Sequence, residues 1–147
     1  KWQARVDDGY YAFNDVNAML AFVGTGNSAA QQRQVDAAKQ AALGHGVNAM
    51  MSREIGVPAC EGLMAFGRGD YAQAIERLLP LRGKAYRFGG SHAQRDLFSW
   101  TPTEAAVRLG NRRLANALVA ERMSWKPESP VNRGWALRAA ALPRYIA

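Results

Sequence analysis

The sequence predicts an all-α fold, and three observations lead to that prediction. Apolar residues make up 48% of the 147 residues, and they recur at the three- and four-residue spacings of amphipathic helices. No stretch shows the sustained alternation of polar and apolar residues that is typical of a half-buried strand. A glycine followed by Asn or Asp closes three apolar stretches, at Gly26, Gly69 and Gly110. Because these positions repeat at about 40 residues, they favour an array of helical hairpins, an α-solenoid.

The first predicted helix precedes the turn at Gly26. Its apolar face is formed by Phe13, Val16, Met19 or Leu20, and Val23. Gly26 can take the left-handed conformation that stops a helix, and Asn27 can cap the helix that follows. Glycine in the same place before Asp70 and before Asn111 predicts the turns of two further hairpins.

The second predicted hairpin has one helix on each side of Asp70. The helix before this residue has Val57, Cys60, Leu63, Met64 and Gly67 on its apolar face, and the helix after it has Tyr71, Ala74, Ile75, Leu78 and Leu79. Pro80 has no N–H to donate to the preceding turn, so we expect the second of these helices to kink or break there. Cys60 is the only cysteine of the chain, and we interpret it as a buried thiol and not as a nucleophile.

The stretch GGSHAQRD, residues 89–96, has the features of a corner between two helices. Its two glycines can end one helix. Ser91 and Gln94 lie three residues apart and can form a capping box, in which each side chain satisfies a backbone N–H of the other residue.

A second helix-start signal follows in the stretch TPTE. Thr101 would cap a helix that begins at Pro102, and Glu104 would complete a capping box. Residues 91–109 are therefore expected to form either two short helices or one kinked helix.

The remaining apolar periodicity predicts two more helices. Leu114, Leu118 and Met123 mark the first of them. The last helix begins with Ser129 as its N-cap and Pro130 in its first position. Its apolar side is formed by Val131, Trp135, Ala139 and Leu142.

Several motifs resemble a known repeat family. GDYAQAIERLLPL resembles the second half of a tetratricopeptide repeat, and REIGVPACEGLMAFGRGDY, LLPLR and GGSHAQRDLF are similar to the C-terminal part of the tetratricopeptide repeat protein 38 family. FNDVNAMLAFVGTG resembles that family's preceding repeat, so the likeness extends roughly from Phe13 to Pro127. It implies a tetratricopeptide-like solenoid without an assigned reaction. Residues 1–147 would then be a single helical-repeat domain and a fragment of a longer repeat protein. Gly83 and Pro102 depart from the family pattern.

The polar residues of GGSHAQRD form the main candidate site. His92, Arg95 and Asp96 lie three and four residues apart, so they share one face of a helix. Three interpretations stay open: a polar cluster that locks two hairpins together, a ligand or peptide contact, and a catalytic group. His45 is the only other histidine and has no metal-ligand spacing to His92 or Cys60. We therefore predict no catalytic residue, no metal and no cofactor.

The net charge of +7 is concentrated in the second half of the chain. Thirteen of the 19 basic residues lie in residues 71–147, with five of the 12 acidic ones. This half is either a solvated basic surface or a site for an acidic peptide or protein, with Arg112 and Arg113 among its candidate binding residues. The aromatic residues Trp2, Trp100, Trp125, Trp135, Phe88 and Phe98 are assigned to packing between hairpins, which makes nucleic-acid binding the weaker interpretation.

Together these observations predict a non-enzymatic scaffold that binds a protein or peptide partner in a helical groove. The alternative is a small-molecule or enzymatic site around His92, Arg95 and Asp96. No apolar run approaches the roughly 20 residues needed to cross a bilayer, and a single cysteine fits a reducing, cytoplasmic setting. The oligomeric state is left open.

Overall fold

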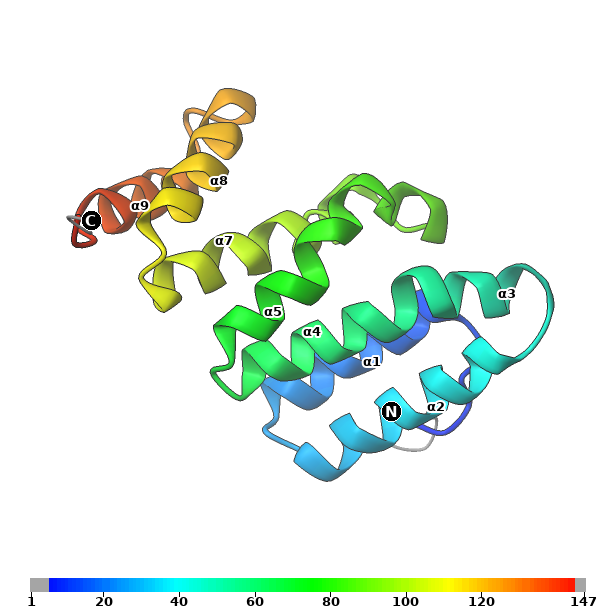
Figure 1. The fold of residues 1–147 in the computed structure, drawn as a ribbon. Helices are drawn as coiled ribbons and strands as arrows, with labels where there is room; N and C mark the ends of the chain where they lie inside the picture. The colour runs from blue at the N-terminus through cyan, green and yellow to red at the C-terminus, as the bar shows by residue number, and fades with distance from the viewer. Residues whose placement is uncertain (1–5, 145–147) are drawn as a thin grey trace.

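The computed structural model describes residues 6–144, and every regular element in that part of the chain is helical (Figure 1). Seven helices have eight residues or more: α1 (Ala12–Gly24), α2 (Ser28–Leu43), α4 (Val57–Gly67), α5 (Tyr71–Leu78), α7 (Leu97–Leu109), α8 (Arg112–Trp125) and α9 (Pro130–Ala140). The all-α prediction is confirmed for the described residues.

Short helical segments connect these seven helices. They are α3 (Gly46–Met51), a π-helical turn (Ser52–Gly56), two 3₁₀ turns (Leu79–Gly83 and Ala85–Phe88) and α6 (His92–Arg95). The π-helical turn joins α3 to α4 without a break. The first 3₁₀ turn begins directly after α5, so the predicted break of the helix before Pro80 is confirmed.

Three of the turns form as the sequence predicts. Gly26, Gly69 and Gly110 have φ values of 66°, 81° and 76°, in the left-handed region that glycine adopts without strain. The side chains of the residues that follow, Asn27, Asp70 and Asn111, accept hydrogen bonds from the backbone N–H groups of Ala30, Gln73 and Leu114. Each glycine therefore ends one helix while its neighbour caps the next.

The helices pack in a regular order along the chain. α2 contacts both α1 and α4, α5 contacts both α4 and α7, and α8 contacts both α7 and α9. Figure 1 shows α2 near one end of the molecule and α9 near the other. Close approach is possible between α4 and α5 because Gly62 has no Cβ: one built there would lie 2.6 Å from Cγ of Leu78.

Two apolar clusters form most of the core. The larger cluster lies under α1, α2, α4 and α5, and it includes Val16, Met19, Val35, Ile55, Cys60, Leu63, Leu78 and Phe98. The smaller cluster joins α7, α8 and α9 through Ala106, Val107, Ala115, Leu118, Val119, Trp135 and Ala139. Cys60 is fully buried, as predicted, and burial raises the pKa of its thiol.

The start of α7 differs from the prediction. Pro102 does not open a helix; it lies inside α7, which begins at Leu97 with Asp96 as its N-cap residue. Thr101, Pro102 and Thr103 are all buried, and this tertiary packing outweighs the local start signal. Thr101 therefore caps nothing, and the side chain of Glu104 is free to take a different role.

The final helix agrees with the prediction at its start and differs along its length. Ser129 caps α9 through the N–H of Asn132, and Pro130 takes the first helical position. Trp135 and Ala139 are buried, whereas Val131 is 45% exposed. Leu142 packs on the smaller cluster but lies beyond the end of the helix.

Candidate functional site

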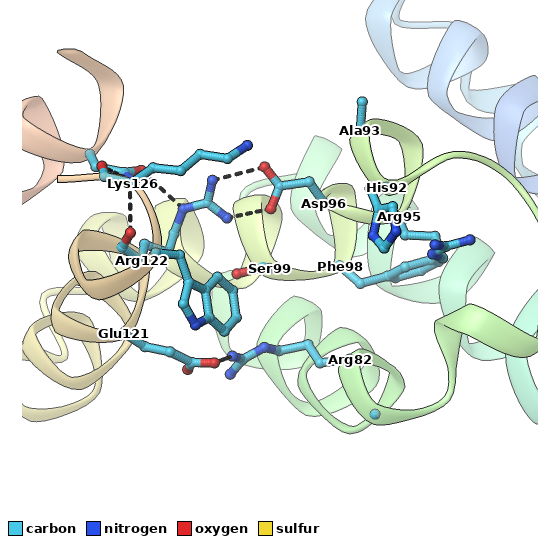
Figure 2. A pocket seen from close by; sticks show the side chains of 13 residues that line it. Arg82, His92, Ala93, Arg95, Asp96, Phe98, Ser99, Glu121, Arg122 and Lys126 are labelled. Atoms are coloured by element: carbon cyan, nitrogen blue, oxygen red, sulfur yellow. Dashed lines mark hydrogen bonds and ion pairs between the residues drawn. The ribbon is translucent and has the colours of Figure 1, made fainter. Parts of the chain in front are cut away.

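The three residues predicted as a polar site line one cavity, shown in Figure 2. We call it the α6–α8 cavity. It has a volume of about 880 Å³, and its walls come from residues 82–83, residues 92–99 and the segment that runs from the end of α8 to Asn132 in α9. Ligand cavities in proteins are typically about 300–1,000 Å³, so the space is large enough for a small molecule.

Asp96 forms a paired ion bridge with Arg122 at the wall of this cavity. Its two carboxylate oxygens accept hydrogen bonds from Nη1 and Nη2 of Arg122, at 2.7 and 2.9 Å. The Arg122 side chain is only 6% exposed. The hydrogen bonds from Arg122 hold the pKa of Asp96 below its usual range, and the charge of the nearby Lys126 adds to this shift.

Asn132 holds the Arg122 side chain in position. Its Oδ1 accepts a hydrogen bond from Nε of Arg122 at 3.2 Å, and its Nδ2 donates to the carbonyl oxygens of Arg122 and Lys126, both at 3.0 Å. Asn132 thereby joins the end of α8 to the start of α9. The Asp96–Arg122 pair adds a link from α8 to the residue that precedes α7.

His92 and Arg95 have different surroundings from Asp96. Nη1 of Arg95 donates to the carbonyl oxygen of Gly90 at 2.5 Å, which fixes the glycine corner. His92 is exposed, and no hydrogen bond joins it to Arg95 or Asp96 within residues 6–144. The three residues therefore share a cavity but do not form one hydrogen-bonded cluster, and of the three only Asp96 bonds to a side chain of another helix, α8.

The corner before α6 forms as predicted. Ser91 and Gln94 form a complete capping box, in which the Ser91 N–H donates to Oε1 of Gln94 at 2.8 Å and the Gln94 N–H donates to the Ser91 hydroxyl. Gly89 and Gly90 both have positive φ values, 93° and 79°. The corner is thus explained by its glycine conformations and by local side-chain hydrogen bonds.

The other two predicted binding residues lie elsewhere. Arg112 and Arg113 line a separate cavity of about 830 Å³ at the turn between α7 and α8, together with Arg144. Arg112 donates to the carbonyl oxygen of Leu142, whereas Arg113 is exposed.

Arg77 and Arg87, also in the basic half, form ion pairs with Glu61 and Glu54. Part of the positive charge of residues 71–147 is therefore neutralised by carboxylates of the same chain.

A second, apolar cavity lies where α1, α4, α7 and α9 face one another, and we call it the groove. It has a volume of about 560 Å³. Its lining includes Leu20, Val23, Phe66, Leu97, Trp100, Val131 and Trp135. The rings of Trp100 and Trp135 meet edge to face, with centroids 4.8 Å apart. Trp135 is buried, whereas Trp100 is 44% exposed and presents its indole to the groove.

Among the described residues that line the groove, Glu104 is the only one with a carboxylate, and hydrogen-bond donors surround it. Its oxygens accept hydrogen bonds from Trp135 Nε1 at 2.6 Å, from both Nη atoms of Arg138 at 2.7 and 3.0 Å, and from Nε of Arg108 at 2.6 Å. Burial raises the pKa of Glu104, but these hydrogen bonds outweigh burial and lower it to about 2. The carboxylate stays ionised and links α7 to α9.

Arg108 and Arg138 leave part of their charge open to the groove. Arg108 lies over the rings of Phe66 and Tyr71, 5.4 and 5.7 Å from their centroids, and its Nη1 contacts the Tyr71 hydroxyl. Both arginine side chains are about half exposed. Two guanidinium groups against one carboxylate give the groove a net positive charge.

Sequence reasoning missed most of these residues. The sequence predicts a capping role for Glu104, which is wrong. It gives no specific role to Arg122 or Arg138. The spacing of Glu104 and Arg108 is the i, i+4 pattern of a helical ion pair, and this signal was present in the sequence. The prediction that the tryptophans pack between helices is right for Trp135, whereas Trp125 is 60% exposed. Trp2 and the side chain of Phe88 lie outside the described part of the structure.

Comparison with known proteins does not assign this sequence to a family. The sequence matches no protein-family model, and no solved structure matches it. Within residues 6–144, no helix is long and apolar enough to cross a membrane. The same residues contain no group of three His, Cys, Asp or Glu side chains that could hold a metal ion. The described part of the chain is all-α, with seven principal helices.

Proposed function

We propose that this chain is a tetratricopeptide-like scaffold that binds a segment of a partner protein in the groove. The order of packing supports a hairpin repeat: α2, α5 and α8 each contact the helix before them and the first helix of the next pair. In helical repeat proteins, stacking of this kind completes a core that no single hairpin can bury, and it leaves a surface for binding. The quoted motifs, which resemble the tetratricopeptide repeat protein 38 family, support the same proposal.

The observation that carries the proposal is the composition of the groove. Four helices that are distant in sequence contribute to it, and each is the first helix of a pair or the final α9. Trp100 and Val131 expose apolar surface there, and exposed apolar surface in a cavity is typical of an interaction site. Trp100, which packs on the buried Trp135 and is itself 44% exposed, resembles the aromatic anchors that dominate binding energy in protein interfaces.

The charge of the groove supports an acidic partner. Arg108 and Arg138 are held in place by Glu104 yet remain half exposed. A partner that places Asp or Glu beside an apolar side chain would contact both the guanidinium groups and the tryptophan pair. Arginine suits this role because its planar group binds carboxylates through paired hydrogen bonds.

Selection from a library of displayed random peptides tests the proposal. We expect enriched sequences to combine acidic and apolar residues, and we expect their binding to weaken as salt rises. Val131→Asp places a negative charge on the wall of the groove and should weaken binding of a selected peptide by about tenfold or more. Leu137→Asp is the matched control, because Leu137 is a 75% exposed residue of the same helix that does not line the groove.

Two outcomes would contradict the proposal. One is the absence of any enriched sequence family. The other is an equal effect of Val131→Asp and Leu137→Asp on peptide affinity, which would place binding outside the groove. Arg138→Gln then tests the acidic preference, because it should reduce the affinity of acidic peptides more than that of their amide analogues.

A further inference from the structure

The geometry points to a second binding site, in the α6–α8 cavity, for a small organic anion that carries a phosphate or carboxylate group. This inference is independent of peptide binding in the groove. It rests on three features of the cavity: cations without acidic partners, a buried hydroxyl without a partner, and a rigid wall.

The cavity has an excess of positive charge. Four cationic side chains line it, against the two carboxylates of Asp96 and Glu121. Both carboxylates are already used, since Asp96 pairs with Arg122 and Glu121 pairs with Arg82. The remaining two cations, Arg95 and Lys126, form no ion pair with any described residue.

Arg95 and Lys126 are available to a ligand for different reasons. Arg95 uses Nη1 to hold the carbonyl oxygen of Gly90, which leaves its other guanidinium nitrogens for a further acceptor. Lys126 is exposed and lies near enough to Asp96 to lower its pKa, yet the two form no ion pair. A ligand with several acceptor oxygens would find donors on both residues.

Ser99 supplies an independent observation. Only 7% of this residue is exposed, and its hydroxyl oxygen has no hydrogen-bond partner among residues 6–144. Buried hydroxyl groups almost always have a partner, so an unpaired one at a cavity wall indicates a place for a ligand atom. Ser99 lines the α6–α8 cavity, and in the view of Figure 2 its oxygen lies between the Asp96–Arg122 and Arg82–Glu121 pairs.

The wall that carries these groups is fixed before any ligand binds. Arg122 is held by both Asp96 and Asn132. Asn132 is held in turn because its Nδ2 donates to the carbonyl oxygens of Arg122 and Lys126. The backbone that carries Lys126 and Ser99 is therefore held in place, and less conformational freedom is lost on binding than in a mobile loop. The Asp96–Arg122 pair also keeps the guanidinium of Arg122 occupied, so the anion would be bound by Arg95, Lys126 and Ser99.

An apolar body on the ligand fits the rest of the lining. Trp125 lines the cavity with its indole 60% exposed. Aromatic side chains of this kind stack on planar or apolar groups. We therefore expect an anionic head near Arg95 and Lys126 and a carbon body against Trp125, in preference to an inorganic ion alone.

Four probes test this inference on the chain as it exists. Phenyl phosphate and benzoate carry a ring with each type of head, inorganic phosphate carries the head alone, and phenol is the neutral analogue. NMR titration should shift the indole N–H signal of Trp125 and the backbone signals near Ser99 with at least one ringed anion. Comparison of phenyl phosphate with benzoate distinguishes the two head groups, and inorganic phosphate should bind more weakly than either preferred probe.

Variants locate the binding site. Lys126→Gln should weaken binding of the preferred anion by about tenfold, whereas Lys84→Gln, which removes an exposed lysine outside the cavity, should leave it unchanged. Ser99→Ala should weaken binding without lowering the thermal midpoint, because the hydroxyl stabilises no other group of the protein. The inference is overturned if no anion binds, if phenol binds as tightly as the anions, or if Lys84→Gln and Lys126→Gln act equally.

Discussion

The N-terminal and C-terminal parts of this chain place carboxylates in opposite surroundings. In the N-terminal part, Asp15 of α1 is buried with a single side-chain contact, a hydrogen bond of 3.2 Å from Nε2 of Gln34. Burial raises the pKa of Asp15 to about 6. In the C-terminal part, Asp96 and Glu104 accept hydrogen bonds from arginine side chains, and the pKa of each is lowered.

Hydrogen-bonded cationic partners, and not the degree of burial, decide whether a carboxylate stabilises this fold. A buried carboxylate without a cation destabilises the folded state when it is ionised, whereas one that accepts several charged hydrogen bonds stabilises it. This difference in the surroundings of the carboxylates parallels a difference in the size of the two apolar clusters. The N-terminal helices share the larger apolar cluster, and the smaller cluster under α7, α8 and α9 is supplemented by ion pairs that join these helices.

The largest effect is expected at Asp96. Asp96→Asn removes the charge that compensates Arg122, whose side chain is almost completely buried. Loss of one partner of a fully buried ion pair typically costs about 3–5 kcal/mol, and we expect the lower end of that range because the Asp96 side chain is 30% exposed. Urea denaturation at neutral pH should show this loss in the free energy of unfolding. Asp36→Asn, at an exposed position of α2, should change it by less than about 0.5 kcal/mol; equal effects would mean that the Arg122 pair contributes nothing.

The next effect concerns Glu104 and acid. The pKa of Glu104 in the fold, about 2, lies below its ordinary value of 4.5. The carboxylate therefore stabilises the fold above pH 4.5, and this contribution is lost as the pH falls towards 2. Glu104→Gln should lower the free energy of unfolding by about 2–3 kcal/mol at pH 6.

The pH dependence provides the control for Glu104. The difference between wild type and Glu104→Gln should shrink as both proteins are unfolded at successively lower pH. Glu128→Gln removes a carboxylate whose side chain is 88% exposed and should show no such difference at any pH. A gap that stays constant from pH 6 to pH 3 would mean that the loss comes from packing and not from the ionised carboxylate.

A smaller effect of opposite sign is expected at Asp15. Its pKa in the fold, about 6, lies above the ordinary 3.8, so its ionisation removes stability as the pH rises from about 4 to 6. Asp15→Asn should raise the free energy of unfolding by about 1–3 kcal/mol at pH 7 and leave it almost unchanged at pH 3.5. Unfolding curves at both pH values measure this. A variant that is less stable than wild type at pH 7 would show that the charge of Asp15 is not the cause of the pH dependence.

The features that could be predicted from the sequence are local ones. The capping box of Ser91 and Gln94, the turns at Gly26 and Gly69, and the break before Pro80 depend on residues within four positions of one another. Short-range rules describe such contacts directly, because backbone geometry brings the groups together in any context. These rules also gave the fold class, since helical periodicity is local as well.

The features that could not be predicted depend on distant residues. Asp96 and Arg122 are 26 positions apart, and Glu104 and Arg138 are 34 apart. Charge alone does not choose among the 15 arginines of this chain, so their partners follow only from how the helices pack. The same limit explains the error at Pro102, where a correct local start signal is overridden by burial in α7.

The smallest effect is expected at His92, and it separates the two kinds of residue in the α6–α8 cavity. One of the three interpretations left open by the sequence is a polar cluster, in which loss of His92 would leave a neighbour unpaired. His92 is instead exposed, without a hydrogen bond to Arg95 or Asp96, so His92→Ala should change the free energy of unfolding by less than about 0.5 kcal/mol. Urea denaturation beside Asp96→Asn measures both residues on one scale. A loss above about 1 kcal/mol for His92→Ala would restore the polar-cluster interpretation, because an exposed side chain without partners cannot account for a loss of that size.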